Sequence, residues 1–559
     1  MYKSYVSPVY GQRWEEFMHS PRANTPEKYR VDHIELEIHL ERLGGGTVFR
    51  VGFTKAIFNK QFYKLDPNDY SRSAKEENGE VLVPAPYLCK FFDEELCADA
   101  NGYVNLHAVC REKNIPLFYD EETGLAVVAM PPAHPFSREE DERFLERIAL
   151  SFEEPHMPEP KYNNSEQTRI LIEESEFPKG DYDWFTKQYV NLYSPSLLIT
   201  RDREGRKVYY VSYEHAEGTG WDELQTETVL RRSYDEGKTW EDVAVFDNIR
   251  WAILFEVKGR IYLCGTLLHP DAALRIARLE DDGSLTEADL HGPEGIWTNP
   301  NAHLIYKGRL HLPTFPYAMS ADVDADFLKP ESWTYSNSFK DMLTKDWFFA
   351  ETGAEGLETF WPLENNVVEK DGKLYQIMRL ECIPNNGYAG LLEMTDDGKN
   401  VKLAPECNGM VEMPTTVTKF MVRYDEATGL YLAFANLPTI PMPFPSRSST
   451  PVSGHRNILG LVASPDLVNW KVLDVMLCDR AVLNCVASAR SHGFQYVIWE
   501  FDGEDLVYVV RESVGYTKTY HDGQCVTLYR LKDYKNFVKE RYENSKIWKN
   551  PNRNRENHN

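Results

Sequence analysis

From about residue 165 to about residue 535, short apolar runs alternate with turns rich in Gly, Asp and Asn. Six turns share a pattern in which a Gly-containing turn precedes an alternating strand, which is typical of β-hairpins. They lie at residues 205–209, 258–262, 307–311, 371–375, 428–431 and 502–506. Their spacing of roughly 50 to 75 residues, in a region without helical periodicity, is typical of a β-propeller. Six units are clear, and the longer spacings leave room for a seventh.

One unit contains a sharper motif. Residues 233–240 read Ser-Tyr-Asp-Glu-Gly-Lys-Thr-Trp and fit the Asp-box, S-x-D-x-G-x-T-W. In such a turn the Asp side chain caps backbone N–H groups, the Gly permits a positive φ and the Trp packs beneath. Residues 464–470 are a degenerate copy, and residues 280–283 and 395–398 are weaker ones. The motif indicates a hairpin between outer strands of a propeller and carries no chemistry of its own.

The first 135 residues have a different, mixed pattern. Residues 81–84 form a short apolar run, and residues 105–113 resemble a short helix. A hairpin is predicted from residues 116–119 to residues 124–129. The region therefore reads as a small α+β domain.

A helix is predicted over residues 138–152. Ser137 and Glu140 have the spacing of a capping box, and Phe144, Leu145, Ile148 and Phe152 recur at helical spacing. Three prolines at positions 155, 158 and 160 then indicate a linker. We therefore expect a mainly β protein: a small α+β domain with its linker over 1–160, a six- or seven-bladed propeller over 161–540, and a polar tail over 541–559.

The charge balance bears on partners. The chain has 559 residues, with 62 Lys and Arg against 87 Asp and Glu, a net charge of −25. Nucleic acids and anionic membranes attract basic surfaces, so neither is expected as a partner.

No apolar run approaches 18 residues, and the N-terminus lacks the apolar core of a secretory signal. Nine scattered cysteines without a C-x-x-C pair indicate reduced thiols, so a cytoplasmic location is expected. The oligomeric state stays open.

No metal or cofactor is expected, because zinc-ligand spacing and nucleotide-binding glycine loops are missing from the sequence. A propeller instead gathers polar side chains at its central channel, which suits a sugar. Glu364 precedes an apolar strand, and Arg379 ends another, where an unpaired charge is costly. Both are candidates, with a turn carboxylate and a salt bridge as the alternatives.

Arg379, Arg456 and Arg511 fall at strand ends in three different units. Converging arginines bind carboxylates in bidentate fashion, although salt bridges to the abundant Asp and Glu are the alternative. Tyr213 and His215 share one face of a predicted strand, where either is a candidate general acid or base. A structural role is the alternative for His215.

Residues 191–537 resemble the sialidase-superfamily β-propellers with BNR repeats. Within them, the chain is most similar to the propellers that act on rhamnose–glucuronate linkages, which are lyases and α-L-rhamnosidases. The resemblance rests on an ordered series of short motifs, at residues 194–196, 233–240, 254–259, 323–326, 363–366, 418–425, 456–457, 494–496 and 521–522. It implies further site residues: Tyr496 and His521 as catalytic groups, and Asn366, Lys419, Gln495 and Trp297 as substrate-binding groups.

Two departures from these relatives matter. They have a Ser-His-Asp run where this chain has residues 212–214, and a His-Thr-Ala-Pro run where it has residues 297–300. Tyr213 thus replaces the histidine on which their chemistry is thought to depend. Compared with sialidases, Glu364 and Arg379 have the expected spacing, and Arg456 and Tyr496 follow in order. The Arg-Ile-Pro motif that supplies the first sialidase arginine, and a clear acid Asp, are missing from the sequence.

The expected function is cleavage of a glycosidic bond in an acidic, uronate-type and rhamnose-containing oligosaccharide. In a lyase, arginines would neutralise the uronate carboxylate while Tyr213 or His215 removes the C5 proton. In a hydrolase, Glu364 would work with Tyr496. The alternatives are an exo-glycosidase of the sialidase type and a sugar-binding propeller without catalysis.

Overall fold

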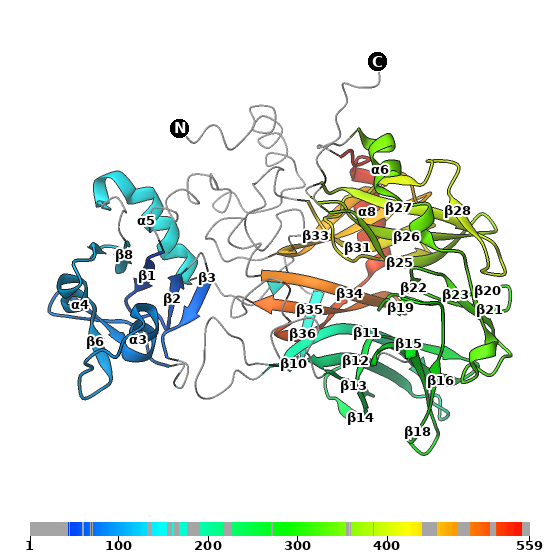
Figure 1. The fold of residues 1–559 in the computed structure, drawn as a ribbon, viewed down its shortest axis with the longest axis horizontal. Coiled ribbons are helices and arrows are strands. Elements are labelled where there is room, and N and C mark those ends of the chain that lie inside the picture. The colour runs from blue at the N-terminus through cyan, green and yellow to red at the C-terminus, as the bar shows by residue number, and fades with distance from the viewer. Residues whose placement is uncertain are drawn as a thin grey trace.

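The structure is a computed structural model of the 559-residue chain (Figure 1). It describes residues 43, 45–58, 61–66, 69, 71–130, 136–153, 159–160, 167–175, 190–216, 226–269, 272–353, 357, 359–383, 385–438, 456–478, 492–514, 521 and 523–550. Strands greatly outnumber helices among these residues, so the prediction of a mainly β protein is confirmed.

Among its described residues, the first part of the chain, blue and cyan in Figure 1, has two sheets and three helices. One antiparallel sheet has the order β3–β2–β1–β8–β7, with β1 (Thr47–Arg50), β2 (Lys55–Phe58), β3 (Gln61–Lys64), β7 (Leu117–Asp120) and β8 (Leu125–Val128). The other contains β4 (Lys75–Glu77), β5 (Glu80–Pro84) and β6 (Tyr103–Asn105). The helices are α3 (Ala85–Phe92), α4 (Leu106–Glu112) and α5 (Arg138–Glu153).

The local signals read from this part correspond to these elements. The predicted hairpin is β7–β8. Helix α4 begins after Asn105, whose side chain accepts a hydrogen bond from the Ala108 N–H at 2.9 Å. Helix α5 begins after Ser137, whose hydroxyl accepts from the Glu140 N–H at 3.3 Å. The apolar side of α5 is buried against Val48 of β1 and its neighbours.

The rest of the chain contains six antiparallel sheets of at least four strands each. The first two are β11 (Asn191–Arg201), β12 (Lys207–Ala216), β13 (Thr226–Ser233) and β14 (Glu241–Asp247), then β15 (Ile249–Val257), β16 (Arg260–His269), β17 (Ala272–Leu279) and β18 (Leu285–Leu290). The third contains β20 (Leu304–Tyr306), β21 (Arg309–Leu312), β23 (Met319–Asp322) and β24 (Trp333–Tyr335). A small pair, β19 (Trp297–Thr298) with β22 (Thr314–Phe315), lies beside it.

The fourth sheet contains β25 (Trp361–Lys370), β26 (Lys373–Glu381), β27 (Tyr388–Met394) and β28 (Val401–Leu403), with β29 (Met410–Glu412) also paired to β27. The fifth contains β30 (Met421–Asp425), β31 (Leu430–Asn436), β32 (Ile458–Ser464) and β33 (Lys471–Cys478). Helices α6 (Lys345–Thr352) and α8 (Tyr534–Asn544) accompany these sheets. Each of the six Gly turns read from the sequence connects the first and second strands of one sheet, which confirms them as hairpin turns.

The sixth sheet is completed from a distant part of the sequence. Its order is β10–β36–β35–β34, so that β10 (Gln167–Glu174) pairs with β36 (Cys525–Leu531), next to β35 (Asp505–Val514) and β34 (His492–Asp502). In Figure 1 the cyan β10 accordingly lies beside orange and red strands. Strand β9 (Glu159–Pro160) likewise pairs with β33, so the end of the predicted proline linker is part of a sheet.

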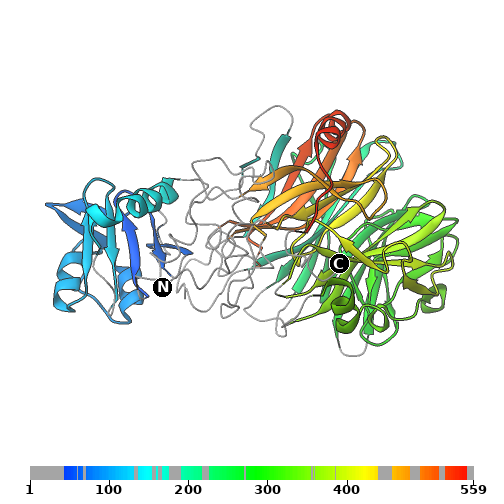
Figure 2. The same ribbon diagram turned by 90° about the horizontal axis from the view of Figure 1, so that it is seen from above.

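The strands that precede the Gly turns in five of the sheets, together with the β19–β22 pair, contact one another in a ring. Strand β34 contacts β11, β11 contacts β15, and β15 contacts the β19–β22 pair. Strand β22 contacts β25, β25 contacts β30, and β30 returns to β34. Figure 2 shows this body from above, with the green sheets on one side and the orange and red strands on the other.

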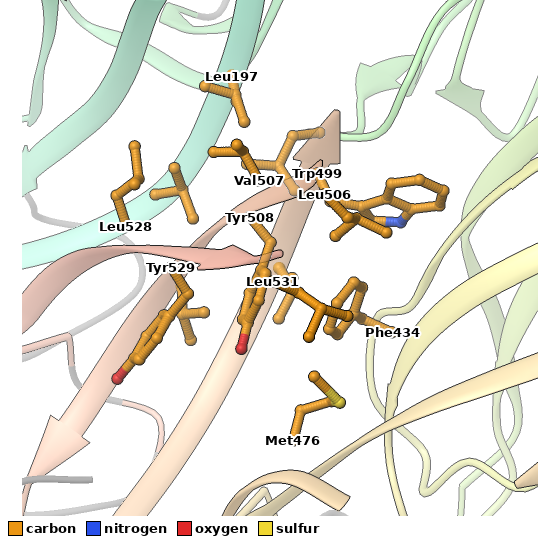
Figure 3. Packing of buried hydrophobic residues seen from close by; sticks show 14 of the residues in the cluster. Leu197, Phe434, Met476, Trp499, Leu506, Val507, Tyr508, Leu528, Tyr529 and Leu531 are labelled. Carbon is orange, nitrogen blue, oxygen red and sulfur yellow. The ribbon is translucent and has the colours of Figure 1, made fainter. Parts of the chain in front are cut away.

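The core fills the spaces between neighbouring sheets. In the cluster of Figure 3, the rings of Phe434 and Tyr508 stack with centroids 4.5 Å apart, and Tyr508 stacks on Tyr529 at 5.1 Å. Leu197 of β11 and Trp499 of β34 belong to the same cluster. Aromatic pairs of this kind add to the apolar area that joins one sheet to the next.

The turn at residues 233–240 joins β13 to β14. Asp235 accepts hydrogen bonds from the Thr239 N–H (2.8 Å) and hydroxyl (2.7 Å), which together lower the pKa of Asp235 to about 2. Gly237 has a φ of +91°, and the Trp240 indole N–H donates to the Gly237 carbonyl at 2.9 Å. In the degenerate copy, Trp470 donates in the same way to the carbonyl of Leu467.

No helix among the described residues has both the length and the apolar character that crossing a membrane requires.

Candidate functional site

A cavity of about 290 Å³ lies where the first strands of several sheets begin. Its walls contain two tryptophans, two carboxylates and two arginines from segments far apart in the sequence. The lining residues are Trp251, Trp297, Thr298, Asn299, Pro300, Leu363, Glu364, Arg379, Glu381, Arg456, Tyr496 and His521. Six of the twelve site residues expected from the sequence are therefore brought together here.

The same β-bulge recurs in the first strand of four sheets. In β11, β15, β25 and β34, one extra residue faces the second strand at the register shift. A bulge of this kind re-aims side chains that would otherwise alternate. Trp251 and Tyr496, at two of the bulges, both have a φ of +52°. Glu364 lies at a third bulge, so each of these three side chains in the cavity wall comes from a bulge.

Two of the bulges are held by buried ionisable groups. The Trp251 N–H donates to the carboxylate of Glu214 at 2.6 Å, and the Lys419 ammonium donates to the Val497 carbonyl at 2.8 Å. Burial raises the pKa of Glu214 above its ordinary value. Burial also lowers the pKa of Lys419 to about 7, although the negative charge of Glu364 opposes this shift. Lys419 thus supports Tyr496 from behind the cavity wall.

Glu364, Arg379 and Tyr496 form the centre of the site. The Tyr496 hydroxyl donates to Glu364 Oε1 at 2.9 Å. Arg379 Nη1 donates to Glu364 at 2.9 Å, and its Nη2 donates to Glu381 at 2.6 Å. Burial, the largest single effect, would raise the pKa of Glu364, but the charge of Arg379 and the hydrogen bonds from Tyr496, Arg379 and the backbone together hold that pKa below the ordinary value. Burial, followed by the negative charge of Glu364, raises the pKa of Tyr496 to about 12.

Arg456 and Arg511 meet behind this centre. Both guanidinium groups donate to Oε1 of Gln495, Arg511 at 2.6 Å. The Arg511 guanidinium also lies 4.4 Å from the Tyr496 ring centroid. Burial, and next the positive charge of Arg456, lower the pKa of Arg511 to about 10. The three predicted arginines therefore gather at one place, where Arg379 and Arg456 line the cavity and Arg511 lies behind Tyr496.

Six predicted site residues are not among the lining residues. Arg511, Lys419 and Gln495 lie behind the cavity wall, as described above, and the other three lie elsewhere. Tyr213 and His215 lie on the face of β12 opposite to Glu214, and both meet Glu173 of β10: the Tyr213 hydroxyl donates at 2.6 Å, and His215 Nε2 lies 2.8 Å from the carboxylate. Asn366 joins β25 to the next sheet, since its side chain accepts from the Val422 N–H at 2.9 Å. The proton-abstracting role expected for Tyr213 or His215 thus has no support from their position.

Six lining residues were missed in the sequence, and Trp251 and Glu381 are the two with the largest bearing on the site. Trp251 meets Trp297 edge to face, with ring centroids 5.1 Å apart, but only the bulge in β15 turns it toward the cavity. Glu381 lies two positions after Arg379 on β26, and strand alternation alone would have placed both on one face.

Among the described residues, no group of three or more His, Cys, Asp or Glu side chains could hold a metal ion.

No protein-family model matches the sequence, and no curated protein matches it. Solved structures give loose matches. Trypanosoma rangeli sialidase is 14% identical with a TM-score of 0.39, over 67% of this chain and 61% of the sialidase. A protein of unknown function from Dyadobacter fermentans is 13% identical with a TM-score of 0.40, over 66% and 100% of the two chains. Penicillium chrysogenum α-L-arabinanase, complexed with arabinobiose, is 12% identical with a TM-score of 0.37, over 66% and 98%.

Proposed function

We propose that the six sheets are the blades of a six-bladed β-propeller, preceded by a small α+β domain over residues 1–160, and that the cavity is its active site. The ring of contacts between first strands supports this arrangement. So does the pairing of β10 with β36, which joins the two ends of the ring within one sheet. A central cavity with polar groups from several blades suits a small polar ligand such as a sugar.

We further propose that the protein cleaves a glycosidic bond next to an acidic sugar. The observation that carries this proposal is the 2.9 Å hydrogen bond from the Tyr496 hydroxyl to the ionised, largely buried Glu364 inside the cavity. A hydroxyl held against a carboxylate is the arrangement of a nucleophile with its base. Tyrosine serves as the nucleophile in some retaining glycosidases.

In this reaction the Tyr496 oxygen bonds to the anomeric carbon while its proton passes to Glu364. The bond from the anomeric carbon to the leaving oxygen breaks, and that oxygen takes a proton, for which His521 in the cavity wall is the candidate donor. Water then attacks the anomeric carbon and gives one proton to the deprotonated His521, while the bond between the sugar and the Tyr496 oxygen breaks. The proton held by Glu364 returns to the tyrosine oxygen, so that both groups regain their first state.

The arginines support an acidic substrate. Arg379 pairs with Glu364 and Glu381, and Arg456 and Arg511 both donate to the Gln495 side chain, so that two guanidinium groups lie close together. The lowered pKa of Arg511 reflects burial and this neighbouring positive charge. A substrate carboxylate at Arg456 would relieve that repulsion. A uronate, with rhamnose as the neighbouring sugar, remains our first choice of substrate.

The test uses 4-methylumbelliferyl glycosides of glucuronate, N-acetylneuraminate, rhamnose and arabinose, because their leaving group departs without an acid. We expect release of the fluorophore from an acidic glycoside. Tyr496→Phe and Glu364→Gln should each lower kcat by roughly 100-fold or more, since a positioned acid or base typically contributes 10²–10⁴-fold. The matched control is Tyr424→Phe, because Tyr424 is 43% exposed and is not among the residues that line the cavity.

Full activity of Tyr496→Phe would contradict the assigned nucleophile. Products that gain a near-ultraviolet absorbance, from a new C4–C5 double bond in a uronate, would indicate a lyase instead. Thermal stabilisation by an acidic oligosaccharide without any product would indicate a sugar-binding protein.

A further inference from the structure

Trp361 is a large apolar side chain held at the rim of the cavity. It is the first residue of β25 and is 52% exposed. In the register of β25 and β26 it lies directly opposite Glu381, a residue of the cavity wall. Directly opposed residues on neighbouring strands have Cβ atoms about 5 Å apart, with side chains on the same face. The indole therefore stands immediately beside the cavity and faces solvent.

A chain of contacts through Lys340 and the buried Phe315 connects Trp361 to the cavity wall. The Lys340 ammonium lies 5.9 Å from the Trp361 ring centroid and 5.5 Å from that of Phe315. The Phe315 ring in turn lies 5.6 Å from Trp297, which lines the cavity with Trp251. A single exposed apolar residue needs no explanation. Trp361 differs because it continues a wall of the site.

Lys340 places a positive charge beside the Trp361 indole. It is exposed, and within the described part of the chain no carboxylate lies within ion-pair distance of its ammonium. The flat indole offers an apolar face to the C–H side of a sugar ring. The ammonium offers a partner for a carboxylate on that sugar.

We propose that Trp361 and Lys340 form a second sugar subsite beside the cavity, which binds the neighbouring unit of an acidic oligosaccharide. The proposal rests on the proposed function, in which the cavity holds the first sugar. It narrows the substrate class to chains of at least two sugars. The first sugar lies against Arg456 and Tyr496, and the second stacks on Trp361 outside the cavity.

Binding is measured by isothermal titration calorimetry in a Tyr496→Phe background, so that the ligand is not consumed. The probes are three acidic disaccharides, rhamnosyl-glucuronate, digalacturonate and sialyl-galactose, each compared with its acidic monosaccharide. For the disaccharide that binds, Trp361→Ala should weaken binding at least 10-fold while the monosaccharide changes less than 2-fold. Trp361→Phe, which keeps a ring, should weaken disaccharide binding less than 3-fold, and Lys340→Met should weaken it about 5-fold.

Tyr424→Ala is the matched control for loss of an exposed aromatic ring, and it should leave both ligands unchanged. Retained monosaccharide binding also shows that each variant is folded. Equal weakening of both ligands by Trp361→Ala, no weakening, or no binding of any disaccharide would overturn the subsite.

The two proposals fail separately. Disaccharide binding that depends on Trp361, in a protein that cleaves no glycoside, supports the subsite and contradicts cleavage. Glycoside cleavage at a rate that does not depend on Trp361 would support the proposed cleavage and contradict the subsite.

Discussion

Single residues in the site are held by charge as much as by packing. Arg379 is almost fully buried and bridges two carboxylates, one of which also receives the Tyr496 hydroxyl. Buried charges are costly unless each is paired and hydrogen-bonded, so such a network fixes the geometry more than it stabilises the fold. The sequence indicated Glu364 and Arg379 because charges beside apolar strands need partners. That Glu364 works with Tyr496, 132 positions away, was expected only from the resemblance to known propellers, because no local signal connects the two residues.

The pKa of Lys419 leads to a prediction at this scale. Its folded pKa of about 7 lies below the unfolded value of about 10.4, so the unfolded chain binds more protons between these values. Stability therefore rises with pH in this window, by at most about 1.4 kcal/mol per pH unit. Relative to Lys419→Met, the wild type should gain unfolding free energy between pH 7 and pH 10, measured by urea denaturation. If the unfolding free energies of the two proteins changed in parallel with pH, the pKa of Lys419 would not be lowered in the folded state.

At the scale of elements, the hairpins were visible in the sequence and the bulges were not. A Gly turn and an alternating strand are local signals, so all six turns between first and second strands were predicted. A bulge adds one residue to one strand, and its position depends on the partner strand and on anchors such as Glu214 from a neighbouring sheet. Trp251 was therefore missed.

Substitutions at two glycines in these turns allow the cost of backbone strain to be distinguished from the cost of overpacking. Gly237 has a φ of +91°, and an added Cβ would lie 3.1 Å from Leu528 of β36 in another sheet. Gly259 has a φ of +73° with open space around it. We expect Gly259→Ala to cost about 1 kcal/mol, from the left-handed backbone alone. Gly237→Ala should cost about 1 kcal/mol more because it also overpacks the contact. If both substitutions lowered the unfolding free energy equally in denaturation experiments, the packing of the Gly237 turn against Leu528 would not contribute to stability.

At the scale of the whole molecule, β10 joins distant parts of the chain. Arg169 of β10 donates to the Tyr529 hydroxyl at 3.2 Å and lies 3.3 Å from the fully buried Glu512. Burial raises the pKa of Glu512, and Arg169 is the main charge that opposes this. Strand β10 therefore supplies the positive charge that balances the Glu512 carboxylate inside the sixth sheet.

Removal of that counter-charge should destabilise the molecule. Arg169→Met leaves Glu512 buried without its cation, and breaking a buried pair typically costs about 3–5 kcal/mol. The folded pKa of Glu512, already raised in the wild type, should then rise further. The deficit should therefore grow as pH increases through the folded pKa of the wild type, which lies above the unfolded value of about 4.3. Arg203→Met is the control, because Arg203 and Asp281 are both exposed, and it should leave the unfolding free energy unchanged. If the two substitutions changed the unfolding free energy equally, the buried Arg169–Glu512 pair would not stabilise the fold.

The sequence alone determined the elements whose causes are local: the hairpins set by Gly turns, the capped helices α4 and α5, and the mainly β character. Only the tertiary structure decided which side chains face one another. Tyr213 and His215 share a strand face, as alternation requires, but that face meets Glu173 because β10 packs there. Tyr496 meets Glu364 because two bulged strands from different sheets begin at one cavity. Such contacts depend on long-range register and closure, which no short stretch of sequence encodes.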